Sequence, residues 1–294
     1  MLQLWWDHLR APLAVFVVLA GTFATTRLDF TIAGALFFDP GRMQWLGAHS
    51  WWSNELLHTG GRWLIRALVL LALLPWLAPE RGGLRARLQP LRRPAAYFAV
   101  SVVLSVGIVG LLKTLTHVEC PWDLTYFGGR HPYVELLGAH GHVSLGATTI
   151  PGASGTGAGT FAGAALHRGH CFPAAHAGSG YALLALYFAL RERSARLARL
   201  GIGCGLAIGL IFGIAQQSRG AHFVSHDVWS AFLAWTVSLS LYCFAFKGRL
   251  WRGIPLHLHG VAAHEASGAP GRLAAGGAVA VYERAGGVAR ASRR

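Results

Sequence analysis

Six long stretches of the chain are nearly free of charged side chains, and their length limits the fold more than any other feature. A helix needs about 20 apolar residues to cross the hydrocarbon core of a bilayer, because each residue adds about 1.5 Å. Only 13% of all residues are charged, against roughly 25% in ordinary soluble domains. We therefore predict an all-α polytopic membrane protein, a bundle of six transmembrane helices at 12–26, 63–77, 95–112, 178–190, 200–216 and 228–246.

The positive charges are divided unevenly between the loops that join these helices. The chain has 26 Lys and Arg and a formal net charge of +14, which in a soluble protein would indicate nucleic-acid binding. Here 18 of the 26 fall on one side of the predicted bundle and 7 on the other. Cytoplasmic loops carry the excess of Lys and Arg, so we predict a bacterial inner-membrane protein with both termini cytoplasmic and no nucleic-acid partner. The first stretch lacks a small-residue cleavage site and is interpreted as a retained helix.

Three predicted loops then face outward, at 27–62, 113–177 and 217–227. The stretch 138–169 is rich in Gly, Ala, Ser and Thr, as expected of a flexible surface loop. Beyond residue 247 the chain shows little apolar periodicity. We predict one membrane domain at 1–247, with an outward-facing site, and a disordered cytoplasmic tail at 248–294.

The four cysteines separate into two groups. Cys204 and Cys243 fall inside predicted helices, where a thiol behaves as a small apolar residue. Cys120 and Cys171 lie in the middle outward loop, on the side of the membrane that is oxidising in a bacterium. A disulfide between these two would contribute roughly 4 kcal/mol by closing a loop of about 50 residues. The alternative is two free thiols.

Ionisable residues lie at several of the outward helix ends, where membrane proteins place groups that line a cavity or do chemistry. Lys and Arg neutralise phosphate charge, and the N–H groups at a helix start also bind anions. One imidazole can attack phosphorus while another protonates the leaving alkoxide, and a carboxylate can hold the nucleophile in place. The residues that predict such a phosphate site are Lys113, His176, Arg219, His222, His226 and Asp227.

A zinc site is the competing interpretation, because many histidines lie on the same predicted face. The spacing of these histidines matches no common zinc pattern, and the H-x3-H pair of His222 and His226 alone is weak support. We therefore predict a site that works without a metal or other cofactor.

Three short motifs lie in order at the outward ends of the last four predicted helices: KTLTHVECP at 113–121, PAAH at 173–176 and SRGAHFVSHD at 218–227. This set resembles the motifs K-x6-R-P, P-S-G-H and S-R-x5-H-x3-D of the type 2 phosphatidic acid phosphatases. Those proteins are integral-membrane lipid phosphatases that share a core with the vanadium haloperoxidases. The resemblance covers roughly residues 95–245.

Two departures from the family pattern remove phosphate ligands. Cys120 stands where the first motif has Arg, and Ala174 stands where the second has Ser. Lys113 and His176 carry over unchanged.

The third motif differs in its spacing. Its nucleophilic His position is occupied by Ser225, and the context GAHF makes His222 the expected nucleophile, with His226 as the alternative. Asp227 then lies one residue beyond the usual interval.

The resemblance implies hydrolysis of a lipid phosphate monoester or diphosphate through a phosphohistidine intermediate, on the periplasmic side and without metal. The implied roles are phosphate binding by Lys113, Arg219 and the backbone at Ala174 and Ala175, attack by His222, orientation of His222 by Asp227, and acid catalysis by His176.

The expected partners are the bilayer and a membrane lipid phosphate. Phosphatidic acid, phosphatidylglycerol phosphate, undecaprenyl diphosphate and the phosphates of lipid A all present the required group. A catalytically degenerate membrane protein or lipid transporter on the same scaffold is the alternative. A haloperoxidase fits less well, because those enzymes are soluble.

Overall fold

The computed structural model describes residues 1–79, 83–133 and 169–251. The chain divides into two units, Met1–Ile254 and Pro255–Arg294, and the second lies outside the described residues. So do most of the predicted tail at 248–294 and nearly all of the glycine-rich stretch at 138–169. The fold described below is that of the first unit.

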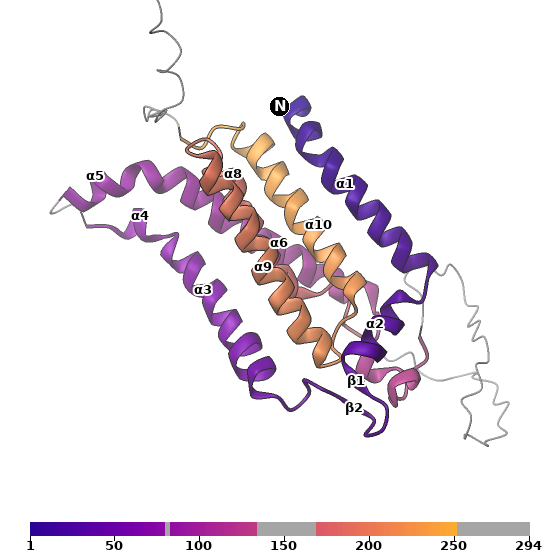
Figure 1. Ribbon diagram of the computed structural model, residues 1–294. Coiled ribbons are helices and arrows are strands. Elements are labelled where there is room, and N and C mark those ends of the chain that lie inside the picture. The colour runs from indigo at the N-terminus through magenta and orange to yellow at the C-terminus, as the bar shows by residue number, and fades with distance from the viewer. Residues whose placement is uncertain (80–82, 134–168, 252–294) are drawn as a thin grey trace, which may run out of the picture. The chain divides into compact units, whose positions relative to one another are not determined.

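Helices dominate this unit, and four helical segments are long and apolar enough to cross a membrane. They contain α1 (Leu2–Thr25), α6 (Arg92–Thr116), α9 (Ala195–Ser218) and α10 (Val224–Ser240), which continues into a π-helical turn at Leu241–Ala245. Figure 1 shows α6, α9 and α10 side by side, with α1 running along α10. The prediction of a helical membrane protein is therefore confirmed, with four candidate spans among the described residues.

The other two predicted spans are helical but interrupted. The stretch 63–77 falls on α3 (Gly61–Leu71) and α4 (Leu74–Leu77), and the break comes just before Pro75, whose ring cannot continue the helical hydrogen bonds. The stretch 178–190 is divided among α7 (Ala175–Tyr181), a 3-10 turn at Ala182–Leu184 and α8 (Ala185–Leu190). Neither reaches the length of a full span, so the structure does not establish six transmembrane helices.

The segment 27–62 was expected to be a loop, and the structure corrects this. It contains α2 (Leu28–Leu36), a small antiparallel pair of β1 (Phe38–Asp39) and β2 (Gln44–Trp45), and a π-helix at Trp52–Gly60 that runs directly into α3. The remaining short elements are α5 (Leu84–Leu88) and 3-10 turns at Gln89–Leu91, Pro121–Asp123 and Thr125–Phe127.

Glycines on α9 let α7 and the 3-10 turn after it approach α9 closely. A Cβ atom at Gly209 would collide with the ring of Tyr181, and one at Gly205 would lie 2.7 Å from the backbone of Leu184. Small residues permit this backbone approach where lipid supplies no hydrophobic force between helices. The contact fixes the end of α7 against the middle of α9 and so sets how these two helices, which carry His176 and lead to Arg219, lie against each other.

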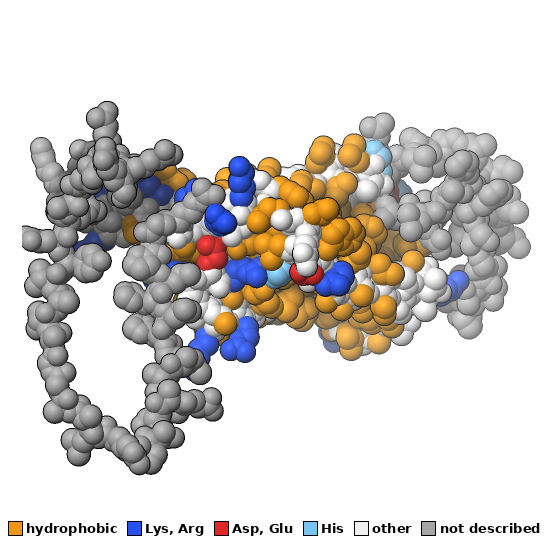
Figure 2. Space-filling model, turned by 90° about the horizontal axis from the view of Figure 1, so that it is seen from above, with side chains coloured by type: hydrophobic (Ala, Val, Ile, Leu, Met, Phe, Trp, Pro, Cys, Tyr) orange, Lys and Arg blue, Asp and Glu red, His pale blue; other side chains and the backbone are white. Residues whose placement is uncertain are grey.

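The interior of the bundle is filled by large side chains that include Tyr97, Phe188 and Leu239, all fully buried. The Tyr97 hydroxyl donates a 2.8 Å hydrogen bond to the carbonyl of Ser238, so its polar end is satisfied inside the core. Many large apolar side chains lie instead on the surface, and Figure 2 shows broad hydrophobic areas on one face. Such exposure suits contact with lipid.

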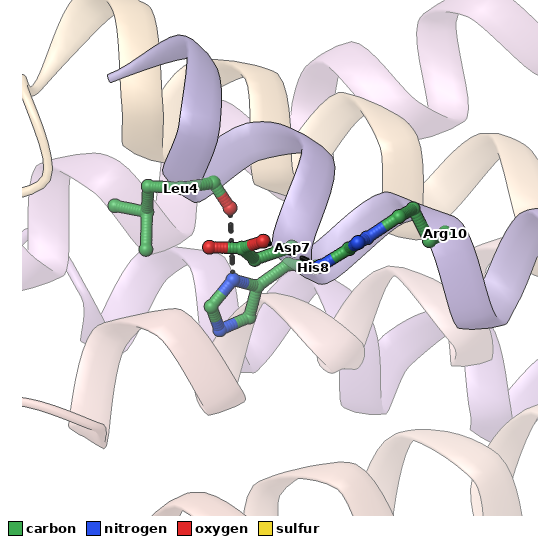
Figure 3. Close-up of polar contacts among 4 residues, drawn as sticks. All are labelled: Leu4, Asp7, His8 and Arg10. Atoms are coloured by element: carbon green, nitrogen blue, oxygen red, sulfur yellow. Dashed lines mark hydrogen bonds and ion pairs between the residues drawn. The ribbon is translucent and has the colours of Figure 1, made fainter.

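Helix α1 is attached to α10 by aromatic packing and one hydrogen bond. Phe16 stacks on Phe232 with ring centroids 4.1 Å apart, and the Trp235 indole N–H donates to the carbonyl of His8 at 2.9 Å. The His8 ring itself donates to the carbonyl of Leu4, one turn earlier (Figure 3).

Candidate active site

The three motif segments meet at one end of the bundle. Lys113 lies in the last turn of α6, His176 in the first turn of α7 and Arg219 directly after α9. His222 follows in the loop between α9 and α10, and His226 lies in the first turn of α10. Because α7 packs against α6, α9 and α10, the structure brings these predicted site residues into one neighbourhood.

A disulfide holds the first motif against the second. Cys120 and Cys171 are bonded to each other, with Cα atoms 5.1 Å apart. Beside it, the Cys171 N–H donates to the carbonyl of Val118 at 3.0 Å, and the Thr116 hydroxyl donates to the carbonyl of Phe172 at 2.6 Å. The residue in the place of the motif Arg is therefore part of a covalent strap between the end of α6 and the approach to α7.

The loop from Ser218 to Phe223 is shaped by Gly220. Its φ of +73° lies in the left-handed region, and a Cβ atom there would collide with the indole of Trp45. The Gly220 carbonyl accepts a 2.9 Å hydrogen bond from the Trp122 N–H, and the Ser218 carbonyl accepts one of 2.8 Å from the Gly47 N–H. These contacts from the β-hairpin and the 3-10 turn position the loop that carries His222.

His222 and His226 form a buried pair. Their Nδ1 atoms lie 3.4 Å apart, and their side chains are only 5% and 4% exposed. Burial lowers the pKa of His222 well below 6.5, and the positive charge of Lys113 lowers it further. His222 is therefore neutral at ordinary pH, as a nitrogen nucleophile must be.

Asp227 lies elsewhere than the sequence analysis expected. Its Oδ2 accepts a 2.6 Å hydrogen bond from the Gln217 amide, and its carboxylate packs against Gly213 on α9. Among the described residues, the ring that contacts His222 is that of His226, not the Asp227 carboxylate. The spacing explains this, because Asp227 lies five residues after His222 and therefore projects from a different face of α10 than His226.

His176 is held by a different part of the chain. Its Nε2–H donates to the carbonyl of Leu57 at 2.9 Å, and its ring stacks on Phe212 with centroids 4.4 Å apart. The ring of His58 lies edge-on to it at 5.0 Å. The candidate general acid is thus fixed by the π-helix that precedes α3.

The predicted phosphate ligands are placed unequally. Lys113 and Arg219 have no carboxylate ion pair within the described parts of the chain, and Arg219 donates at 3.2 Å to the Gln216 side chain. The Ala174 N–H, by contrast, already donates to the carbonyl of His226 at 3.4 Å. Of the two backbone N–H groups predicted to bind phosphate, that of Ala175 at the start of α7 is the one left for this role.

Sequence reasoning missed two residues, His58 and Arg62, that face this site from outside the motifs. Burial lowers the pKa of His58, and the charges of Arg219, Arg62 and Lys113 lower it further, so these cations share one neighbourhood. The i, i+4 spacing of His58 and Arg62 places both on one face of the helical segment and was the available signal.

A third residue that was missed is Asp29. Its Oδ1 accepts a 3.0 Å hydrogen bond from the N–H of Ser225 in the first turn of α10. Within the described residues, no three His, Cys, Asp or Glu side chains converge as a metal-binding group.

A helical membrane protein that gathers Lys, Arg and several His at its helix ends has the arrangement of a phosphate-binding membrane enzyme. The chain matches the PAP2 superfamily over residues 94–249, which is more than half of its length, and therefore belongs to that superfamily. No curated protein and no solved structure matches the chain. Members of the superfamily are phosphatases, so the coarse assignment is a membrane phosphatase of the lipid phosphatase superfamily.

Proposed function

We propose that the protein hydrolyses a lipid phosphate monoester or diphosphate through a phosphohistidine on His222. The observation that carries the proposal is a neutral, buried His222 in the neighbourhood of His176 and of Lys113 and Arg219, two cations without a carboxylate ion pair among the described residues. A nitrogen lone pair beside two cations is the combination needed to attack a negatively charged phosphorus centre.

In the first step the His222 ring nitrogen attacks phosphorus, and the bond from phosphorus to the lipid oxygen breaks. Lys113 and Arg219 neutralise the phosphoryl oxygens, with help from the backbone N–H of Ala175. His176, protonated on both ring nitrogens, delivers its Nδ1 proton to the departing alkoxide. Burial and the neighbouring cations lower the pKa of His176 to about 4, and the negative charge of a bound phosphate raises it again, so the proton is loaded with the substrate. Its Nδ1 has no hydrogen-bond partner among the described residues and is free for this exchange.

In the second step water replaces His222 on phosphorus. His176, now neutral, accepts a proton from the attacking water, the nitrogen–phosphorus bond breaks, and inorganic phosphate leaves. No step uses a metal ion.

The distribution of Lys and Arg supports a periplasmic site in a bacterial inner membrane, with both termini in the cytoplasm. The substrate tails would then remain in the bilayer beside the exposed apolar faces of the helices, while the headgroup reaches the helix ends.

The test is phosphate release from a panel of phospholipids and polyprenyl diphosphates by detergent-purified protein in the presence of EDTA. We expect release by the unchanged protein and loss of at least about 1000-fold for His222→Ala and for His176→Ala, because each removes a reacting group. His49→Ala, an exposed histidine on the hairpin side, is the matched control and should keep the full rate.

Equal rates for all these proteins would overturn the proposal. Lipid binding without any phosphate release would favour the alternative of a catalytically degenerate protein or lipid transporter, which the replacements of the motif Arg by Cys120 and of the motif Ser by Ala174 support.

A further inference from the structure

We propose that His226 is the positioning residue for His222 and takes the part that a carboxylate plays in a nucleophile–acid pair. This inference rests on the proposed function, because it assumes that His222 attacks phosphorus. The proposed partner is a neutral imidazole and not an anion. The pair therefore differs from a His–carboxylate pair in where the His222 proton goes and in the pH dependence of kcat.

The contact between the two rings carries the inference. The Nδ1 atoms of His222 and His226 lie 3.4 Å apart inside the protein, and a hydrogen bond between them requires one ring to donate and the other to accept. Both rings also interact with the backbone of Cys171. If His222 donates, its Nδ1 carries the proton and its Nε2 carries the free lone pair. That tautomer is the one that can attack phosphorus through Nε2.

The surroundings of the two rings distinguish the nucleophile from its partner. Lys113 acts electrostatically on both rings, whereas His176 acts on His222, which places His222 nearer the candidate general acid. His226 instead lies edge-on to Phe172 and Phe223, with centroids 5.2 and 5.6 Å away. Packing against these two aromatic rings suits a fixed supporting role for His226.

The backbone of His226 is fixed from several directions. Its carbonyl accepts hydrogen bonds from the Ser230 hydroxyl at 2.9 Å and from the Ala174 N–H at 3.4 Å. The Ser230 hydroxyl also donates to the Ala174 carbonyl at 2.9 Å, which links α10 to the start of α7. A ring mounted on so constrained a turn can hold its partner within the tolerance that catalysis requires.

Asp227 cannot serve in this role from its present position. Its carboxylate is engaged by Gln217 and packs against Gly213 of α9, away from the histidine pair. His226 lies four residues after His222, the interval at which the family motif has its Asp. Asp227 is the next residue in the sequence, but it is the His226 ring that lies within hydrogen-bond distance of the His222 ring.

The proton balance of the pair is complete. Attack by His222 Nε2 forms the nitrogen–phosphorus bond and leaves a positive charge on the ring, and the Nδ1 proton then passes to Nδ1 of His226. His226 becomes an imidazolium and the phosphorylated ring is neutral. On hydrolysis the proton returns, so that His222 leaves phosphorus as a neutral imidazole.

The charged groups around the pair set its pH dependence. Lys113 from α6 and His176 from α7 act on His222, and Lys113 also acts on His226. Asp29 from α2 acts on Asp227 of α10. Both groups that act on the pair are cations when protonated, so they favour a neutral His222–His226 pair at ordinary pH.

The experiment compares His226→Ala, His226→Asp and Asp227→Asn in the full-length protein, with kcat, KM and the pH profile of kcat measured for the same lipid phosphate. We expect His226→Ala to lower kcat by about 100-fold to 10,000-fold with KM changed less than about threefold, since a lost orienting partner acts on the chemical step.

His226→Asp should recover at least a tenth of the lost rate and move the acid limb of the profile to higher pH. The reason is that a carboxylate stabilises the protonated form of His222 and so raises its pKa. Asp227→Asn should leave the acid limb where it is. A purely structural role for His226 would not give rescue by Asp together with this shift.

The inference is overturned if His226→Ala keeps the unchanged kcat and profile, or if Asp227→Asn alone moves the acid limb. Melting curves show whether each variant is folded. If His226→Ala does not fold, the recovered kcat and the shifted acid limb of His226→Asp test the inference instead. The proposed function fails separately, if His222→Ala retains turnover or if the unchanged protein releases no phosphate.

Discussion

Asp29 on α2 accepts a hydrogen bond from the N–H of Ser225 on α10, across 196 positions of sequence. The first N–H groups of a helix have no partner within the helix, and the Asp29 side chain satisfies one of them. This carboxylate comes from another element, so it also fixes α10 beneath the loop that carries His222. The N-terminal segment thereby takes part in building the site.

Asp29→Ala is expected to lower the free energy of unfolding by about 1 kcal/mol, the usual loss for a helix-capping side chain, and to lower kcat as well. The exposed Asp7, paired with Arg10 at 2.6 Å (Figure 3), provides the matched control. Asp7→Ala should change stability by less than about 0.5 kcal/mol, because exposed ion pairs contribute little. Thermal unfolding in detergent measures both, and equal shifts would contradict the cap.

Burial raises the pKa of Asp29 above its ordinary 3.8, which gives the cap a pH dependence. A carboxyl group with a raised folded-state pKa contributes its full stability below 3.8 and loses it as pH rises through the folded value. Asp29→Asn should therefore flatten the change of melting temperature with pH above about 4. A slope that stays the same in this variant would show that other groups cause it.

Reduction of the Cys120–Cys171 disulfide, or Cys171→Ser, should lower both melting temperature and turnover. The bond closes a loop with a sequence separation of 51 residues, worth roughly 4 kcal/mol in the chain-entropy model. Turnover should fall because Lys113 and the start of α7 lose their covalent tie. Cys204→Ser on α9 is the matched control and should behave like the unchanged protein.

Thiol labelling gives an independent check of the disulfide. In denatured, unreduced protein we expect two reactive thiols, Cys204 and Cys243, and four after reduction. Four reactive thiols before reduction would show that the bond is absent from the protein as purified.

Arg62→Gln should weaken substrate binding, with KM raised about 3-fold to 10-fold and a smaller effect on kcat, because a partly solvated cation contributes about one kcal/mol to holding an anion. Arg66 lies one turn beyond Arg62 and packs over the Trp63 ring at 4.9 Å, so Arg66→Gln is the matched control. If Arg66→Gln raises KM as much as Arg62→Gln, general surface charge is responsible.

The acid limb of the pH profile of kcat/KM should fall below pH 6.5, because burial and the charge of Lys113 lower the pKa of His222 and keep it neutral there. Lys113→Gln removes this positive charge, so the pKa of His222 should rise and the acid limb should move to higher pH. Comparing both proteins on one substrate cancels the titration of the substrate itself. An unmoved limb would mean that a different group controls it.

Vanadate should inhibit competitively, since its trigonal-bipyramidal form resembles the transition state of phosphoryl transfer, for which the site is expected to be complementary. EDTA should leave the rate unchanged. Loss of activity in EDTA that zinc restores would instead favour a metal site.

The sequence by itself indicated the membrane class and the position of most helices, and it identified Lys113, His176, Arg219 and His222 as candidate site residues. Apolar stretches of this length are local signals, because the bilayer demands an uninterrupted helix whatever its neighbours are. The sequence did not reveal the breaks in the segments at 63–77 and 178–190, or the helix and hairpin inside 27–62, which depend on packing against α9 and the site loop.

Only the tertiary structure showed which side chains of the candidate site contact each other. Sequence spacing paired His222 with Asp227, whereas the turn at the start of α10 places His226 beside His222 and sends Asp227 to Gln217. Likewise, Asp29, His58 and Arg62 precede the first motif, and their approach to the site follows from α2 and the π-helix packing on α10 and α9. Contacts between distant segments depend on how helices pack, and no local pattern of residues records that geometry.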